Sequence, residues 1–123
     1  MKQKGYKGKL VNIFSVKPLD KELINRLATQ VRGIVTIENH SVIGGLGGAI
    51  SEVLAQKTNH APISYVGVED IFTESGSATE VKEKYGLNVE NIVSKVEQTM
   101  KSNTAISMQT EKSLLRKFKN LFK

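Results

Sequence analysis

The stretch "IVTIENHSVIGGLGGAISEVL", residues 34–54, decides the fold because it passes from a strand to a helix within a few positions. Residues 34–37 form a short, mostly β-branched apolar run, which is typical of a buried strand. Four glycines then fall within five positions, and apolar residues recur on one side of residues 46–54. This pattern predicts one β-α step of an α/β domain. It also raises the question of whether the glycine turn binds a ligand or only allows the helix to pack on the sheet.

Strands and helices are expected to alternate on both sides of this step. Apolar runs at 9–16 and 63–68 predict two further strands, each buried on both faces of a sheet. Helical spacing and capping residues predict three more helices, over 20–33, 77–86 and 89–100. Alternation of this kind implies right-handed crossovers between parallel strands. The predicted fold class is therefore α/β, a small doubly wound and mainly parallel β-sheet with helices on both faces.

Length, charge and cysteine content narrow the class of protein. The 123 residues fit one compact domain, and no apolar run approaches the length of a membrane-spanning helix. The formal charge of +6 belongs to the two ends, because residues 1–9 hold four lysines and residues 112–123 hold five basic residues with no acid. Solvated basic ends are favoured over a nucleic-acid-binding surface. The sequence has no cysteine and no signal peptide, so a cytoplasmic protein is expected, with neither a nucleic-acid nor a membrane partner.

The glycine turn departs from the known phosphate-binding patterns. Gly45 and Gly47 have the first spacing of a dinucleotide fingerprint, but Ile50 stands where the third glycine belongs. The chain also lacks the Gly-Lys-Ser/Thr ending of a P-loop. An anion could bind the free N–H groups at the helix start. Close packing of backbone against backbone is the favoured interpretation, with the anion site as the alternative.

Glu38 and His40 are two positions apart and could form a general base with its polarising partner. A histidine that forms only a local hydrogen bond is the favoured interpretation. Zinc is disfavoured, because the chain has only two histidines, His40 and His60, and no cysteine.

The last part of the chain is expected to differ from the rest. Helical patterning weakens after Met100, so residues 1–98 are predicted to form the α/β domain and residues 99–123 a linker and a basic amphipathic helix. The apolar stripe of that helix consists of Leu114, Leu115, Phe118, Leu121 and Phe122. Such a helix normally docks on its own domain or on a neighbouring chain. Docking on a membrane surface or a partner helix is the alternative.

Three blocks of sequence resemble the C-terminal domain of transketolases, in its order and spacing. They are "VNIFSVKPLD", "IVTIENHSVIGGLGGAISEVLA" and "VGVEDIFTESGSATEVKEKYGL", and the resemblance covers residues 5–97. The corresponding domains of deoxyxylulose-phosphate synthase and of the β subunit of pyruvate dehydrogenase are weaker matches. The resemblance implies an enzyme that transfers two-carbon ketol units between sugar phosphates with thiamine diphosphate and Mg²⁺.

The same resemblance implies that the chemistry lies outside this chain. The family binds its diphosphate, its metal and its aminopyrimidine through other domains, so no catalytic, cofactor-binding or metal-binding residue is expected here. The chain alone is expected to be inactive, as a scaffold that contacts the remaining transketolase domains or subunit and forms a homo-oligomer. The residues that match the family blocks are expected to form interface or structural loops, namely Glu38, His40, Gly44, Gly45, Gly47, Glu74, Ser75 and Gly76.

The beginning of the chain departs from the family pattern. Family domains start with a strand, a turn and a helix ahead of the strand that matches residues 9–16, so a fragment truncated at its start is expected. The family's first strand would lie between 10–16 and 34–37. Its absence would leave a gap of about 9–10 Å between these two strands. We expect either direct pairing of these two strands or a strand or helix borrowed from a second copy. A stand-alone module that holds an anionic partner through the basic ends and the terminal amphipathic helix is the rival from a different class.

Overall fold

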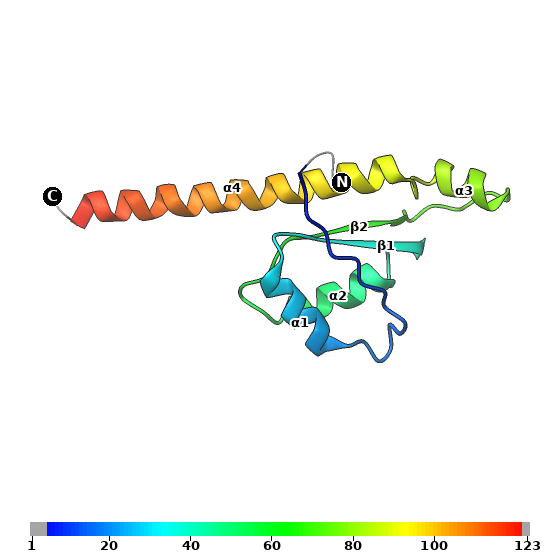
Figure 1. The fold of residues 1–123 in the computed structure, drawn as a ribbon, viewed down its shortest axis with the longest axis horizontal. Coiled ribbons are helices and arrows are strands. Elements are labelled where there is room, and N and C mark those ends of the chain that lie inside the picture. The colour runs from blue at the N-terminus through cyan, green and yellow to red at the C-terminus, as the bar shows by residue number, and fades with distance from the viewer. Residues whose placement is uncertain (1–4, 122–123) are drawn as a thin grey trace.

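The computed structural model describes residues 5–121, with the side chains of residues 104–107, 110, 114 and 117–121 left outside the description. Four helices and two strands follow one another along these residues (Figure 1). In chain order they are α1 (Lys21–Gln30), β1 (Ile34–Ser41), α2 (Leu46–Leu54), β2 (Ile63–Val68), α3 (Ala78–Lys84) and α4 (Val89–Leu121).

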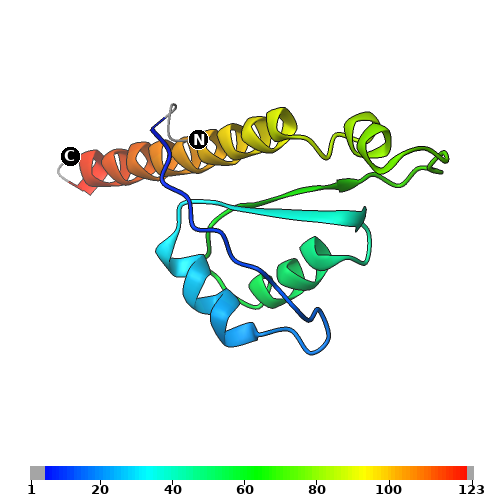
Figure 2. The same cartoon turned by 45° about the vertical axis from the view of Figure 1, so that its right-hand side comes forward.

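Both strands belong to one parallel sheet that lies between two layers of helices. Ile34 pairs with Ile63, and the register continues to Ile37 with Val66 before an irregularity ahead of Ser41. Helices α1 and α2 cover one face of the sheet, and α4 crosses the other face (Figures 1 and 2). The predicted α/β class, with a parallel sheet and helices on both faces, is confirmed.

The prediction of a strand at 9–16 is wrong. This segment is extended but pairs with no strand among the described residues, and Leu10 and Phe14 are each 93% exposed. The expected direct pairing of 10–16 with 34–37 is also wrong, because a cavity of about 510 Å³ lies between the segment and β1. An apolar run becomes a strand only where a neighbouring strand forms hydrogen bonds with its backbone N–H and C=O groups. Among the described residues, no strand does so for this segment.

Local capping signals fix where two helices begin. Asp20 accepts a hydrogen bond from the backbone N–H of Leu23 at 2.9 Å and thereby starts α1. Ser77 and Glu80 form the predicted reciprocal capping box at the start of α3. Each cap satisfies backbone donors that have no partner within the helix, so both predictions from the sequence are confirmed.

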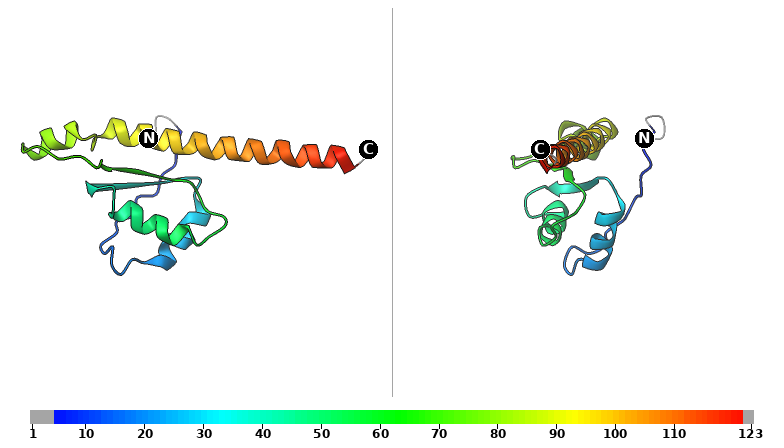
Figure 3. Two further views of the ribbon diagram at one scale, coloured as in Figure 1. Left: turned by 180° about the vertical axis from the view of Figure 1, so that it is seen from behind. Right: turned by 90° about the vertical axis from the view of Figure 1, so that its left-hand side faces the viewer.

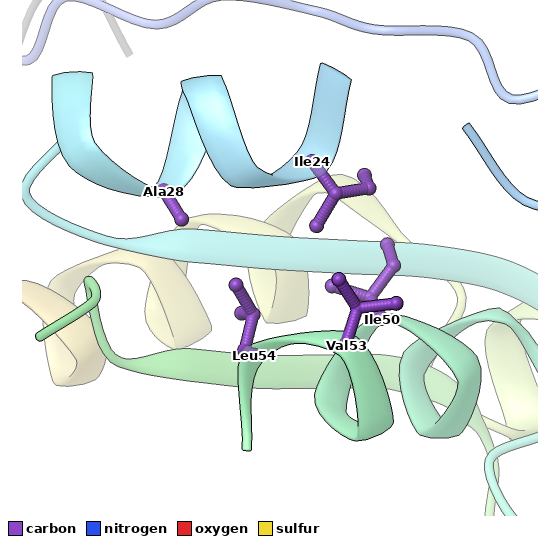
Figure 4. Close-up of a cluster of buried hydrophobic side chains, with 5 residues drawn as sticks. All are labelled: Ile24, Ala28, Ile50, Val53 and Leu54. Carbon is purple, nitrogen blue, oxygen red and sulfur yellow. The ribbon is translucent and has the colours of Figure 1, made fainter. Parts of the chain in front are cut away.

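The hydrophobic core lies where α1 and α2 meet beneath the sheet (Figure 4). Its buried members are Ile24 and Ala28 of α1 and Ile50, Val53 and Leu54 of α2. Leu54 is only 1% exposed. Full burial of an aliphatic side chain of this size contributes about 1.5–3 kcal/mol, so this small cluster supplies much of the stability of this layer.

Helix α4 packs on the opposite face of the sheet through small polar side chains. The hydroxyl of Thr99, 3% exposed, lies 2.7 Å from the hydroxyl of Ser64. A Cβ at Gly33 would lie 2.8 Å from the Thr99 methyl group, so glycine at this position lets the helix approach the sheet. Asn103 then donates to the carbonyl oxygen of Arg32.

The prediction of a linker from residue 99 is wrong, because α4 is one uninterrupted helix of 33 residues. Its last part extends past the end of the sheet (Figures 1 and 3). Of the predicted apolar stripe, Leu115 is 55% exposed, and the side chains of the other four members lie outside the described residues. Within residues 5–121, no helix combines the length and the apolar character of a membrane span.

Replacement of Leu54 by alanine should remove a fully buried side chain and leave a cavity between α1 and α2. The free energy of unfolding should fall by roughly 2–5 kcal/mol, measured by urea denaturation followed by circular dichroism. Leu10→Ala is the matched control, because Leu10 is exposed and its loss should change stability by no more than about 0.5 kcal/mol. Equal effects of the two substitutions would contradict the placement of the core.

Candidate functional site

The carboxylate of Glu38 binds the start of helix α2. One carboxylate oxygen accepts from the Leu46 N–H at 2.7 Å, and the other accepts from the Gly47 N–H at 3.0 Å. The N-cap residue of this helix, Gly45, has no side chain that could cap it. A negative group at a helix start satisfies free N–H donors and is favoured by the helix dipole. Glu38 therefore occupies the place where an external anion would otherwise bind.

The glycines around this contact provide the space that it needs. Gly44 has a positive φ of 72°, which favours glycine in the turn. A Cβ at Gly45 would collide with the Glu38 carboxylate, and a Cβ at Gly47 would collide with the ring of Tyr65. The glycine turn therefore serves to dock α2 on the sheet. The predicted packing role is correct in kind, although Gly47 meets side chains of the sheet rather than its backbone.

A second polar contact holds α2 one turn later. The hydroxyl groups of Ser51 and Tyr65 lie 2.5 Å apart and join the helix to β2. This pair was not predicted. The only sequence signal for it is that Tyr65 falls on the same strand face as Ile63 and Gly67, and that Ser51 is one helical turn beyond Gly47.

His40 lies near the end of β1, so Glu38 and His40 belong to a strand rather than to the expected loop. The His40 Nδ1 atom lies 3.3 Å from the carbonyl oxygen of the adjacent Ser41, and the ring is exposed. The Glu38 carboxylate accepts hydrogen bonds from α2, and among the described residues it forms none with His40. The arrangement matches a histidine with a local contact and does not form a polarised acid–base pair.

A hollow of about 740 Å³ opens beside this end of β1. Its polar lining includes Asn39, His40 and Lys82, and Lys82 comes from α3, more than 40 positions along the chain. Sequence spacing gave no signal for Lys82, because only the fold brings α3 to this end of the strand. No group of three histidine, cysteine or acidic side chains in the described part of the chain is placed to hold a metal ion.

The other predicted site residues lie on the segment that joins β2 to α3. Glu74 forms an ion pair with Lys84 at 2.6 Å, and its backbone N–H donates to the hydroxyl of Tyr85 at 2.8 Å. Ser75 and Gly76 are exposed on the same segment. None of the three contributes to the lining of the hollow beside β1. The structure therefore brings Glu38, Gly45 and Gly47 together. It leaves Glu74, Ser75 and Gly76 on a separate surface segment. The interface role predicted for these residues stays a prediction.

Glu80 has a lowered pKa, because the Ser77 hydroxyl donates to its carboxylate at 2.6 Å and the Ser77 N–H donates to it at 3.1 Å. Both bonds favour the ionised form. A lowered folded-state pKa means that the capping box stabilises the domain above the ordinary titration range of glutamate. That contribution is lost as the pH falls through the folded-state pKa.

Comparison with known proteins agrees with this architecture. The family model for the transketolase C-terminal domain matches residues 1–92. A protein of Methanocaldococcus jannaschii with the provisional name of a transketolase C-terminal section is 38% identical over 101 residues, 82% of this chain and 31% of the relative. A 1-deoxy-D-xylulose-5-phosphate synthase of Heliobacterium modesticaldum is 38% identical over 92 residues, 75% of this chain and 14% of the synthase.

A solved structure shares the fold as well. It is described as a split gene transketolase, inactive beta4 tetramer, and it matches with a TM-score of 0.75 and 39% identity over 81% of this chain and 32% of that one. The fold and the Glu38–glycine contact define an α/β domain with a parallel sheet, built around a strand-to-helix turn. The chain belongs to the transketolase C-terminal domain family. It spans about a third of the length of its transketolase relatives.

Replacement of Glu38 by alanine should leave the Leu46 and Gly47 N–H groups without their acceptor. The free energy of unfolding should fall by roughly 1–3 kcal/mol, because each part-buried donor loses its bond. Glu69→Ala, which removes the same charge from an exposed position, should change it by no more than about 0.5 kcal/mol. Equal unfolding midpoints for the two variants in urea would contradict the docking role of Glu38.

Replacement of Ser77 by alanine should raise the pKa of Glu80 towards the ordinary value, since the main hydrogen bond that lowers it is removed. Carbon-detected NMR titration of the Glu80 carboxyl group in the two proteins measures this difference. An unchanged Glu80 pKa in Ser77→Ala would show that the capping box does not form.

Proposed function

We propose that this chain supplies the C-terminal scaffold and interface domain of a transketolase. The whole enzyme transfers a two-carbon ketol unit between sugar phosphates. The observation that carries the proposal is the match to a split gene transketolase, at 39% identity over 81% of this chain but only 32% of that one. The relative from Methanocaldococcus, itself named as a section of a transketolase, supports the same assignment.

The described residues of this chain do not fit thiamine diphosphate or Mg²⁺. A diphosphate would need free donors at a glycine-rich helix start, but Glu38 already fills the start of α2. A magnesium site needs several oxygen ligands, and the described residues bring no such acidic group together. We therefore assign both cofactors to other domains of the enzyme. No reaction step is assigned to the residues of this chain.

The scaffold role follows from how the matched residues are used. The carboxylate of Glu38 joins α2 to the sheet through its two hydrogen bonds. The absence of side chains at Gly45 and Gly47 lets the helix approach the sheet closely enough to form them. Two large apolar side chains are exposed, Ile43 in the glycine turn at 63% and Phe72 on the segment between β2 and α3 at 103%. Exposed apolar residues of this size are suited to contact with other domains or with further copies of the chain. We place the assembled enzyme in the cytoplasm, in keeping with the absence of cysteine.

A second assignment has specific support. The deoxyxylulose-phosphate synthase of Heliobacterium is as similar to this chain as the transketolase section is, at 38% identity. The two enzymes would use the same domain in the same structural role. We favour transketolase because the match to the transketolase section covers a larger share of this chain, 82% against 75%, and because the solved structure is described as a split gene transketolase.

A chimera tests the proposal. This chain replaces the matched 101 residues of the Methanocaldococcus protein, and ketol transfer from a ketose phosphate to an aldose phosphate is measured after addition of the cofactor-binding polypeptide, thiamine diphosphate and Mg²⁺. The chimera should be active, whereas this chain alone and a version of the relative without the matched residues should show only background turnover. Turnover by this chain alone, or an inactive chimera that folds and assembles, would contradict the proposal.

A further inference from the structure

The part of α4 that extends past the sheet carries an exposed face that is both apolar and basic. Met108 and Leu115 are 57% and 55% exposed, and they lie two helical turns apart on one side of the helix. Lys112 and Arg116 lie on the same side, and among the described residues neither forms an ion pair. An open hollow of about 470 Å³ runs along this side, and its lining includes Lys112, Leu115 and Arg116. Together these four residues form the tail face.

A second exposed surface, the head patch, lies on the segment between β2 and α3. It consists of Glu69, Asp70, Ile71 and Phe72, of which Ile71 is 56% and Phe72 103% exposed. The Ile71 N–H donates to the Glu69 carbonyl oxygen at 2.7 Å, which turns the chain at this point. Within the part of the chain that the structure describes, the two acidic side chains form no ion pair. The head patch therefore presents two unpaired negative charges beside two uncovered apolar side chains.

The tail face and the head patch are complementary in both charge and apolar character. The ring of Phe72 fits the hollow on α4 against Leu115, where Lys112 and Arg116 flank it with two positive charges. The two surfaces lie at opposite ends of the molecule (Figures 1 and 3). One chain therefore cannot join its own head patch to its own tail face, whereas two copies can.

Other partners would cover only part of this exposed surface. An anionic membrane or a nucleic acid would match the charge of the tail face but would leave the head patch uncovered. Pairing of two tail faces would bring Lys112 and Arg116 of both copies together, and like charges at an interface are unfavourable. A contact between tail face and head patch covers the apolar side chains of both surfaces and pairs their charges.

We infer that the chain associates with a second copy of itself head to tail, with the tail face of one copy on the head patch of the next. Such a contact is directional and leaves one head patch and one tail face free in every open assembly, so growth stops only when a ring closes. The family model ends at residue 92, ahead of the tail face, so the contact uses a part of α4 outside the matched domain. The inference goes beyond the proposed function and does not rest on it.

Sedimentation velocity of the full chain tests this contact. The average mass should rise with protein concentration at low ionic strength. It should fall as salt is raised from about 0.01 M to about 1 M, because the Debye length shrinks from about 30 Å to about 3 Å. Phe72→Ala and Leu115→Ala should each weaken the association about tenfold or more. Leu10→Ala is the matched control, because it removes an exposed leucine from neither surface and should associate as the unchanged chain does.

A mixture of the two weakened variants gives the sharper result. Phe72→Ala keeps its tail face, and Leu115→Ala keeps its head patch, so each alone should stay monomeric where the unchanged chain associates. Mixed in equal amounts, they should form dimers and nothing larger, because one intact contact remains for each pair. Both substitutions replace exposed side chains, and circular dichroism should show that both variants are folded.

Three outcomes would overturn the inference. The first is an unchanged chain that stays monomeric at every concentration, and binding of that chain to phosphatidylserine vesicles would then assign the tail face to a membrane surface. The second is a Phe72→Ala variant that associates as strongly as the unchanged chain, which would leave the head patch outside the contact. The third is a mixture of folded variants that stays monomeric. None of these results changes the transketolase assignment, which the activity of the chimera decides.

Discussion

The bond between the Glu38 carboxylate and the first N–H groups of α2 is the contact on which the domain depends. It joins a strand to the helix that follows it, and it satisfies donors that the glycine turn leaves free. The glycines at 45 and 47 are required because any side chain there would strike Glu38 or Tyr65. An acidic residue and a glycine-rich turn, which together suggest a ligand site, thus form a fixed joint within the fold.

The rest of the structure is arranged around this joint. Once α2 is held against the sheet, Ile50, Val53 and Leu54 meet α1 and close the core, while α4 covers the opposite face through Thr99. What stays open is the outer edge of β1 and the polar hollow at its end.

The sequence predicted the features that depend on local chemistry. The caps at Asp20 and Ser77 and the strand at 63–68 follow from neighbouring residues alone. The prediction of a strand at 9–16 failed because an apolar run forms a strand only beside another strand, and here Leu10 and Phe14 are exposed rather than buried. The break expected after Met100 failed for a related reason: where α4 leaves the sheet it has no apolar surface to cover, so the loss of patterning does not end the helix. Lys82 could not be predicted, because only the fold brings it beside His40.

The joint between β1 and α2 can be observed directly in solution. Scalar couplings transmitted across hydrogen bonds, measured by NMR between the amide nitrogens of Leu46 and Gly47 and the carboxyl carbon of Glu38, report these two bonds and nothing else. Both couplings should be present in the chain without any added ligand. The absence of both, with the helix intact, would mean that Glu38 is free and that the glycine turn is open to an external anion.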